Sequence, residues 1–281
     1  MIVALFPNLK KSRSKSIALG IKEFLLAHKV TVVMDDQEAG MLGTDPISKI
    51  NPKDIQLQIV LGGDGTILRI FHSHSEIEAP LLGINLGSLG FLAETPITDI
   101  YPTLEAIIAG TCDVEERIII QGETINGEKC FAVNEIVVHR ARNPSLIDLS
   151  IHVDGIYLNT FSADGVIVAT PCGSTAYSLS AGGPILTPEL DVLVLTPISP
   201  HTISNRPIVL KPKQEIQIQY ISEHGPVEIC YDGIHTFHMS TGEVFYIKPS
   251  TKKFRLIHFQ KRDYFSTLRS KLNWSGKLRS S

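Results

Sequence analysis

The chain has 281 residues, of which 43% are hydrophobic and 20% are charged, and its formal net charge at pH 7 is −3. This composition excludes an intrinsically disordered chain, which would be poor in apolar residues and high in net charge. At roughly 150 residues per domain, the length favours one large domain or two.

The first part of the chain alternates short apolar runs with helical patterns. Strands are predicted at residues 2–6, 30–34, 55–61 and 81–84, and helices at 14–28, 66–74 and 100–109. Strands that alternate with helices are typical of a parallel sheet covered by helices on both faces. We therefore expect an α/β domain over residues 1–114.

After Cys112 the helical patterns nearly vanish. Short strands separated by Gly, Pro, Asn and Asp are predicted at residues 117–125, 130–139, 148–153, 155–159, 166–170, 192–197, 207–210, 215–220, 227–231 and 243–248. Many short strands at this spacing favour a sandwich or another all-β architecture. We expect an all-β domain over residues 115–257.

The C-terminal segment, residues 258–281, contains a helix-compatible stretch at 263–274. Residues 251–281 hold nine basic residues and one acidic residue, so they sum to +8 and the rest of the chain sums to −11. Such an end is either a nucleic-acid-binding arm or a segment that packs back onto its own protein.

Cysteine spacing and hydropathy indicate the compartment. Cys112, Cys130, Cys172 and Cys230 are too far apart for zinc-binding pairs, and four reduced thiols are expected in a cytosolic protein. The apolar start of the chain is only six residues long, which predicts a strand rather than a signal peptide. No apolar run approaches the ~20 residues that span a bilayer. The sequence therefore predicts a soluble, cytoplasmic protein that does not bind membranes.

The first candidate site is a glycine-rich loop between a strand and a helix, Leu61-Gly62-Gly63-Asp64-Gly65-Thr66. Glycines let a ligand approach the backbone, and the N-terminus of a helix binds phosphate. A carboxylate here repels phosphate, so Asp64 needs a compensating role: holding a metal, or accepting a proton from an attacking hydroxyl. The alternative is an Asp that merely caps the following helix.

Two further segments contain candidate site residues. A second glycine-rich run, residues 83–91, follows the next predicted strand, and the carboxyl ends of neighbouring strands define a ligand crevice in α/β sheets. In the β-rich part, Asn134-Glu135 and Asp164 precede the small-residue segment 173–184. An amide beside a carboxylate suits a vicinal diol. Each segment alone is equally compatible with a glycine-rich turn or a polar strand edge.

The histidines do not predict a metal site. His72 and His74 lie two residues apart on a predicted helix and therefore on different faces. His235 and His238 are close enough to pair on a turn, but no Cys or carboxylate stands at ligand spacing.

The sequence as a whole resembles the NAD kinase family. The resemblance covers nearly the whole chain in order and is carried by Gly62-Gly63-Asp64-Gly65-Thr66, Gly83-Ile84-Asn85, Leu89-Gly90-Phe91, Asn134-Glu135, Asp164-Gly165, Thr170-Pro171, the segment 173–184, Pro200-His201-Thr202, Arg206-Pro207, Asp263-Tyr264-Phe265 and Leu272-Asn273-Trp274. The Gly-Gly-Asp-Gly loop alone is weak evidence, because phosphofructokinases and lipid kinases contain it too.

The resemblance implies a Rossmann-like or phosphofructokinase-like α/β domain followed by an all-β NAD-binding domain. It also implies that the C-terminal segment returns to the first domain, so the basic end is expected not to bind nucleic acid. The reaction it implies transfers a phosphoryl group from ATP, or from polyphosphate in some members, to the 2′-hydroxyl of the adenosine ribose of NAD. Asp64 would accept the hydroxyl proton, and a divalent metal, Mg²⁺, would arrive with ATP.

The residues implied to bind nucleotide lie in both domains, with the site between them. They are Gly62, Gly63, Gly65, Arg69, Phe91, Asn134, Glu135, Asp164, Thr175, Ala176, Tyr177, Ser178, Leu179 and Ser180. Asn134 and Glu135 would hold NAD, while Asp164 and the segment 175–180 would shape the nicotinamide and adenine pockets. The family also implies a homo-oligomer, a dimer or a tetramer.

Three positions depart from the family pattern. Leu86 replaces a polar or basic residue, Ser162 replaces an Arg, and Ile234 replaces a Gln. The change at Ser162 leaves the preference between NAD and NADH open. The alternatives to an NAD kinase are a lipid or sugar kinase with the same glycine-rich loop, or a non-catalytic nucleotide sensor that uses the basic end of the chain.

Overall fold

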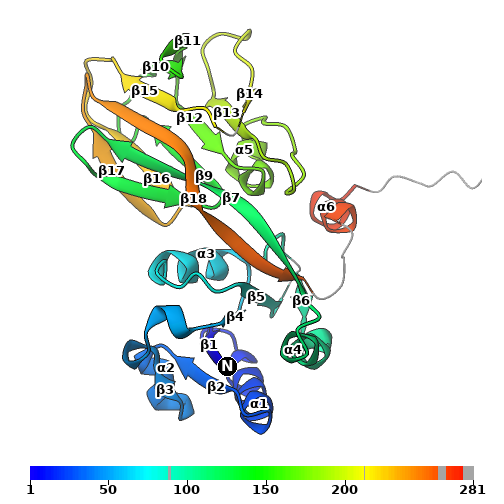
Figure 1. Cartoon of the computed structure of the whole chain (residues 1–281). Helices are drawn as coiled ribbons and strands as arrows, with labels where there is room; N and C mark the ends of the chain where they lie inside the picture. Colours follow the sequence, from blue (N-terminus) through cyan, green and yellow to red (C-terminus); the bar gives the residue numbers. More distant parts are fainter. Residues whose placement is uncertain (88–89, 212, 259–263, 275–281) are drawn as a thin grey trace, which may run out of the picture. The chain divides into compact units, whose positions relative to one another are not determined.

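The structure is a computed structural model that describes residues 1–87, 90–211, 213–258 and 264–274. The chain forms two compact units, which we call unit 1 (Met1–Glu116 with Arg255–Ser281) and unit 2 (Arg117–Phe254). The chain leaves unit 1 within strand β7 (Asp113–Thr124) and returns to it within strand β18 (Val244–His258) (Figure 1). Leu89 and Asp263, which the family resemblance includes, and Ser88 of the glycine-rich run 83–91 lie outside the described residues.

Unit 1 is an α/β domain. Its strands are β1 (Ile2–Pro7), β2 (Thr31–Met34), β3 (Asp45–Pro46), β4 (Leu57–Leu61), β5 (Leu81–Asn85) and β6 (Thr95–Pro96). Its helices are α1 (Ser14–Ala27), α2 (Asp36–Leu42), α3 (Asp64–Ser73), α4 (Ile100–Ile108) and α6 (Tyr264–Leu272). Short 3₁₀ turns occupy Ile47–Lys49, Pro52–Asp54 and Ile97–Asp99. Among the described residues, no helix is long and apolar enough to cross a membrane.

The sheet of unit 1 has the strand order β3-β2-β1-β4-β5, and all of these strands are parallel. The end of β18 joins it in parallel with β5, at Leu256 and Leu81. The strand order reverses at β1, which has β2 on one side and β4 on the other. Ligands of open α/β sheets bind outside the carboxyl ends of the strands at such a switch point. The loops after β1 and β4 are therefore placed where a ligand is expected.

Helix α1 shows how sequence pattern becomes packing in unit 1. Its apolar stripe at Ala18, Ile21 and Leu25 is almost fully buried, whereas Leu26 on the opposite face is 53% exposed. The spacing i, i+3, i+7 puts the buried three on one side of the helix. They pack with residues of β1, β4 and α4 in one apolar cluster.

Unit 2 is all-β apart from two short helical turns. Its strands are β7, β8 (Lys129–Ala132), β9 (Glu135–His139), β10 (Ile147–Val153), β11 (Ile156–Ala163), β12 (Gly165–Ala169), β13 (Leu193–Ile198), β14 (Ile208–Leu210), β15 (Ile216–Tyr220), β16 (Val227–Tyr231), β17 (His235–Met239) and the first part of β18. The turns are a 3₁₀ helix at Cys172–Thr175 and α5 (Tyr177–Ser180).

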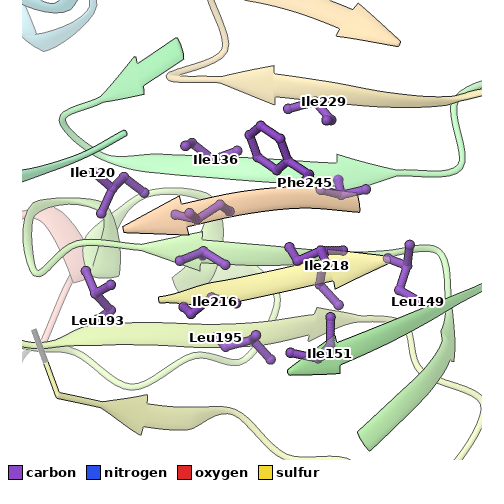
Figure 2. Packing of buried hydrophobic residues seen from close by; sticks show 14 of the residues in the cluster. Ile120, Ile136, Leu149, Ile151, Leu193, Leu195, Ile216, Ile218, Ile229 and Phe245 are labelled. Atoms are coloured by element: carbon purple, nitrogen blue, oxygen red, sulfur yellow. The ribbon is translucent and has the colours of Figure 1, made fainter. Parts of the chain in front are cut away.

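Two sheets of unit 2 enclose its core. One is antiparallel with the order β14-β13-β12-β9-β16-β17, and the other contains β11-β10-β15-β18, with β7 pairing with β18 and β8. Inward-facing side chains of both sheets form a single apolar cluster, in which Ile136 of β9, Ile218 of β15 and Phe245 of β18 are fully buried (Figure 2). Alternation along a strand gives one buried face, as in the Ile-Gln-Ile-Gln-Tyr sequence of β15.

The α/β and all-β parts that the sequence predicts are confirmed, but several elements differ. The single strand predicted at 130–139 is wrong: it is interrupted between Ala132 and Glu135, so that β8 and β9 are separate. The interruption arises because the carboxylate of Asp232 accepts hydrogen bonds from the backbone N–H groups there. The sequence also misses α2, β17 and the two helical turns, which are short and lack a clear apolar period.

Candidate active site

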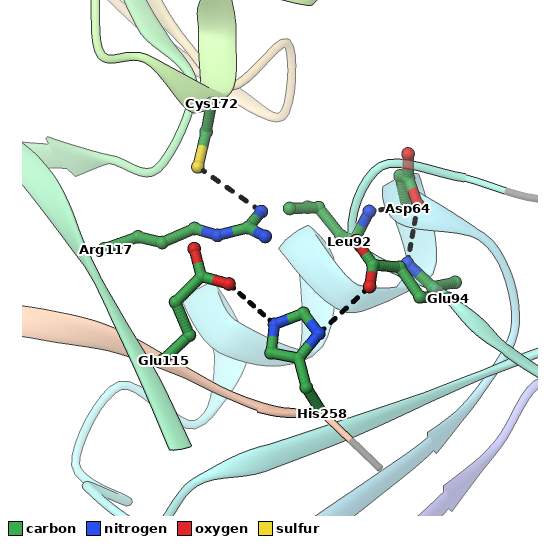
Figure 3. A network of polar contacts seen from close by, with 8 residues as sticks. Asp64, Leu92, Glu94, Glu115, Arg117, Cys172 and His258 are labelled. Carbon is green, nitrogen blue, oxygen red and sulfur yellow. Dashed lines mark hydrogen bonds and ion pairs between the residues drawn. The ribbon is translucent and has the colours of Figure 1, made fainter. Parts of the chain in front are cut away.

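The glycine-rich loop of unit 1 connects β4 to α3 and places Asp64 as the first residue of the helix. Gly63 occupies the N-cap position, and no side chain caps α3. The Asp64 carboxylate instead accepts three consecutive backbone N–H groups, from Phe91 (2.8 Å), Leu92 (3.1 Å) and Ala93 (2.9 Å). Figure 3 shows the Asp64 carboxylate beside the backbone of Leu92. The alternative that Asp64 merely caps its helix is therefore wrong; the carboxylate binds the loop after β5, and with it Phe91.

The glycines around Asp64 fall into two groups. A side chain on Gly62 would overlap Thr66, and one on Gly90 would overlap the Asp64 carboxylate, so the protein's own packing requires both glycines. At Gly63 and Gly65, a Cβ would meet nothing within 4 Å. Because packing does not explain these two glycines, their open backbone is suited to a ligand that approaches the N-terminus of α3 closely.

A cavity of about 500 Å³ lies beside this loop, at the carboxyl ends of β1 and β2. Asn8 and Lys10 line it from the loop after β1, and Thr66 and Arg69 line it from α3. The Asn8 side-chain amide donates to the Thr66 hydroxyl at 3.3 Å. The cavity thus brings two cationic residues, Lys10 and Arg69, to the switch point of the sheet, with two acidic residues, Asp35 and Glu38, on its wall as well. Arg69 was singled out in the sequence, whereas Asn8 and Lys10 were missed, because a single Asn or Lys after a strand is a weak signal.

His258, at the end of β18, forms a partly buried charge cluster with two carboxylates of unit 1. Its Nδ1 lies 3.0 Å from Oε2 of Glu94, and its Nε2 lies 2.7 Å from Oε2 of Glu115 (Figure 3). Burial alone would lower the pKa of His258, but the hydrogen bonds and negative charges of Glu115 and Glu94 outweigh it and raise the pKa to about 9. Glu94 directly follows the loop that Asp64 holds. The sequence could not reveal this cluster, because its members are far apart in the chain.

A second cavity of about 500 Å³ lies within unit 2 and is lined by Glu135, His139, Arg140, Asp164, Tyr177 and Cys230, among others. Glu135 is only 7% exposed, and its Oε2 atom is buried without a hydrogen-bond partner. Burial, followed by the negative charge of Asp232, raises the pKa of Glu135 to about 8, although a hydrogen bond from the Tyr177 backbone opposes the shift. A buried carboxyl with an unsatisfied oxygen is costly unless a ligand completes it.

Asn134 lies in the break between β8 and β9, and Glu135 begins β9. The Asp232 carboxylate accepts from the N–H groups of Val133 (2.8 Å), Asn134 (2.7 Å) and Glu135 (3.2 Å). The Asn134 carbonyl accepts from the N–H of Thr170 at 2.8 Å, and a side chain at Gly173 would overlap it. The start of the small-residue segment is thus packed directly on the Asn134-Glu135 turn.

The six predicted residues 175–180 have different surroundings. The Tyr177 side chain is 46% exposed and lines the cavity. Ser178 is fully buried, and its hydroxyl lies 3.0 Å from that of Thr196. The Thr175 hydroxyl donates to the carbonyl of Cys172 at 3.2 Å. Ala176 and Leu179 are half-buried and Ser180 is exposed.

Asp164 lines the same cavity as Glu135 and pairs with Arg140, whose Nε lies 2.7 Å from Oδ1. His139 ends β9, and its Nε2 lies 3.1 Å from the Glu228 carboxylate. The sequence analysis missed both His139 and Arg140. His139 could have been found from its place on the strand that Glu135 begins, where alternate residues share a face, whereas Arg140 lies beyond the strand end. Ser162, one of the departures from the family, donates its hydroxyl hydrogen bond to Asp148.

Known proteins match both units. A family model for the ATP-NAD kinase N-terminal domain matches residues 3–112, and one for the ATP-NAD kinase C-terminal domain matches residues 133–259. An NAD kinase of Protochlamydia amoebophila is 55% identical over 278 residues, covering 99% of this chain and 100% of that protein. The chain belongs to the NAD kinase family. An NAD kinase of Moorella thermoacetica is 38% identical and covers 98% of this chain and 90% of its own length.

Solved structures of NAD kinase family members have the same fold. The structure of yeast NADH kinase complexed with NADH is 27% identical, has a TM-score of 0.88, and covers 100% of this chain and 90% of that one. The structure of an NAD kinase from Archaeoglobus fulgidus in complex with ATP is also 27% identical, with a TM-score of 0.76 and coverage of 98% and 100%.

Proposed function

We infer that the chain transfers the γ-phosphoryl group of ATP to the 2′-hydroxyl of the adenosine ribose of NAD, giving NADP. Within the structure, this inference rests on Glu135, which lines the cavity of unit 2. Its carboxyl group is buried, and its Oε2 atom has no hydrogen-bond partner. Ribose hydroxyls are donors that satisfy such an oxygen. The family membership of the chain supports the same substrate.

We propose that unit 2 binds NAD in this cavity. Asn134 and Glu135 would hold a ribose, because an amide and a carboxyl together match the donors and acceptors of a diol. The partly exposed Tyr177 ring offers a surface on which a flat heterocycle stacks. Asp164 and the neighbouring residues Thr175, Ala176, Leu179 and Ser180 would shape the rest of the pocket. For Ser178 the buried hydroxyl beside Thr196 supports a packing role.

We propose that the cavity of unit 1 receives the triphosphate of ATP. Lys10 and Arg69 supply positive charge, while the open backbone at Gly63 and Gly65 and the N-terminus of α3 supply N–H groups. A divalent cation, expected to be Mg²⁺, would enter as part of the MgATP substrate. Phosphoryl transfer needs charge neutralisation of this kind more than it needs covalent chemistry.

Asp64 is proposed to orient the 2′-hydroxyl and accept its proton. A carboxylate has about four acceptor sites, and the three N–H groups of residues 91–93 leave room for one more donor. A loose phosphoryl transition state requires little proton removal at an early stage, so positioning matters more than basicity. The bonds to residues 91–93 would hold the carboxylate in place, and Phe91 would contact nucleotide beside it.

Oligomeric state and location are further proposals. The family resemblance supports a homo-oligomer, either a dimer or a tetramer, which light scattering of the purified protein would distinguish. The four cysteines are free thiols, which supports a reducing cytoplasmic environment.

A product assay tests the proposed function. Purified protein would be incubated with Mg²⁺, with NAD or NADH as acceptor and ATP or polyphosphate as donor, and NADP or NADPH would be measured with an NADP-specific dehydrogenase. We expect NADP formation from NAD and ATP. Parallel reactions with diacylglycerol and fructose 6-phosphate cover the other kinase classes, and phosphorylation of either one without NADP formation would overturn the assignment.

A further inference from the structure

The turn between β16 and β17 contains an acidic residue in an unusual backbone conformation. Asp232 has a φ of +49° and is followed by Gly233 with a φ of +64°. The Asp232 side chain is buried, at 8% exposure, and its carboxylate accepts from the N–H groups of Val133, Asn134 and Glu135. Its own N–H donates to the carbonyl of Glu135 at 3.1 Å. One residue thus fixes the backbone of the whole turn.

These bonds determine where Asn134 and Glu135 lie. Successive N–H groups that converge on one anion form a concave anion-binding site, and each bond is strengthened by the charge. An unbroken strand from 130 to 139 would send neighbouring residues to opposite faces of the sheet. The Asp232 carboxylate instead ends β8 at Ala132 and starts β9 at Glu135.

The negative charge of the Asp232 carboxylate also acts unfavourably on the nearby Glu135 carboxyl group. A residue that only fixes the backbone would not need this interaction. The charge of Asp232 adds to burial in raising the pKa of Glu135. A cavity-lining carboxyl group whose pKa is raised by burial and by a second buried carboxylate is typical of functional sites rather than of structural ones. Other titratable or charged residues line the same cavity: His139 at the end of β9, Arg140 directly after it, Asp164 between β11 and β12, Tyr177 of α5 and Cys230 of β16.

We propose that Asp232 is a positioning residue that holds the Asn134-Glu135 turn in the form that recognises the ribose hydroxyls of NAD. This inference rests on the proposed function. Burial, together with the negative charge of Asp232, raises the pKa of Glu135 to about 8 and so favours the protonated carboxyl, which donates as well as accepts a hydrogen bond.

The chain offers a matched control for this role in the turn between β10 and β11. Asp154 has a φ of +51° and is followed by Gly155 with a φ of +77°. Its carboxylate accepts from the Glu215 N–H at 2.9 Å and from the Gln214 side-chain amide at 3.1 Å. Asp154 is exposed. It therefore has the same turn conformation and the same type of bond in the same unit, without contact to residues 133–135.

The test compares Asp232→Ala, Asp232→Asn and Asp154→Asn in the full-length protein. Asp232→Ala is expected to raise the KM for NAD at least about tenfold, because three charge-assisted bonds are lost. Asp232→Asn should raise it less, since one amide oxygen still accepts from Asn134 and Glu135. The KM for ATP should stay at the wild-type value in both. Asp154→Asn should leave both KM values unchanged.

The pH dependence of NAD affinity, measured by calorimetry, gives a readout that mere destabilisation does not move. Removing the charge of Asp232 lowers the pKa of Glu135, so the pH at which NAD affinity changes should move down in Asp232→Asn. A wild-type KM for NAD and a wild-type pH profile in Asp232→Asn would overturn the inference. If Asp232→Ala does not fold, Asp232→Asn alone decides. A wild-type protein that forms no NADP would instead refute the proposed function.

Discussion

Asp64 in unit 1 and Asp232 in unit 2 use the same hydrogen-bond arrangement. Each carboxylate accepts three consecutive backbone N–H groups, from residues 91–93 in the first case and from 133–135 in the second. Their surroundings differ. Asp64 opens a helix beside glycines with open backbone, whereas Asp232 is buried in a turn next to a second carboxyl group.

The two units therefore use the same hydrogen-bond arrangement for different purposes. In unit 1 the carboxylate itself is the proposed reacting group, and the N–H groups hold it still. In unit 2 the carboxylate is the support, and the residues that it holds are the proposed ligand-binding groups. Substitutions in the two units should therefore have different effects. Those at the unit 1 site should change the turnover number, and those at the unit 2 site should change NAD affinity.

Asp64→Asn should have the largest effect. Loss of the proton acceptor is expected to reduce kcat by about 10²–10⁴-fold, while calorimetry should show nearly unchanged NAD affinity. Asp36, which lies in the first turn of α2, provides the control, and Asp36→Asn should retain full activity. Undiminished turnover in Asp64→Asn would refute the role assigned to this carboxylate.

Glu135→Gln should affect NAD binding by unit 2. NAD affinity is expected to fall about tenfold or more, because a carboxyl partner of the ribose is lost. Glu243→Gln, in the same unit, serves as the control and should bind NAD normally. Equal NAD affinities in the two variants would contradict the assignment of Glu135.

Glu135→Gln is also expected to gain stability relative to the wild type at high pH. The pKa of Glu135 is raised from 4.5 to about 8 in the folded protein, so its contribution to stability is fully present below pH 4.5 and is lost as the pH rises through 8. Glu135→Gln removes this loss, so its free energy of unfolding relative to that of the wild type should be higher at pH 9 than at pH 5. Urea unfolding at pH 5 and pH 9 measures the difference, and an unchanged difference between the two pH values would speak against a buried, titrating Glu135.

His258→Gln should have the smallest effect, and it should lower the stability of the protein, whereas Glu135→Gln is expected to gain stability relative to the wild type at high pH. The raised pKa of about 9 means that the stabilisation from Glu115 and Glu94 is fully present below pH 6.5 and is lost as the pH rises through 9. The variant should therefore be less stable than the wild type at pH 6 by about 1–2 kcal/mol, with a smaller difference at pH 10. His238→Gln, at a 65% exposed side chain, is the control. A constant deficit across this range would contradict the charge cluster.

The sequence predicts the regular parts of the fold and the location of the site loops. Continuous apolar runs identify β1 and β4, which are buried on both faces, whereas the periods 3.6 and two identify α1 and β15, which bury one face. Gly62-Gly63-Asp64 and Asn134-Glu135 are recognisable because they follow strands and because the whole motif set resembles one family.

Contacts between distant residues could not be predicted in the same way. The bond of Asp64 to residues 91–93 and that of Asp232 to residues 133–135 join positions 27 to 99 apart in the chain. The break between β8 and β9 follows from the second of these contacts rather than from local propensity. His258 with Glu94 and Glu115, and Arg140 with Asp164, are likewise products of the tertiary fold.

The position of the transferred phosphate tests the account most directly. The product formed from NAD, ATP and Mg²⁺ by the purified protein would be examined by ³¹P NMR and mass spectrometry. We predict one new phosphate monoester, on the 2′-oxygen of the adenosine ribose. A phosphate at another position, or phosphoryl transfer to another acceptor with NAD left unmodified, would contradict it.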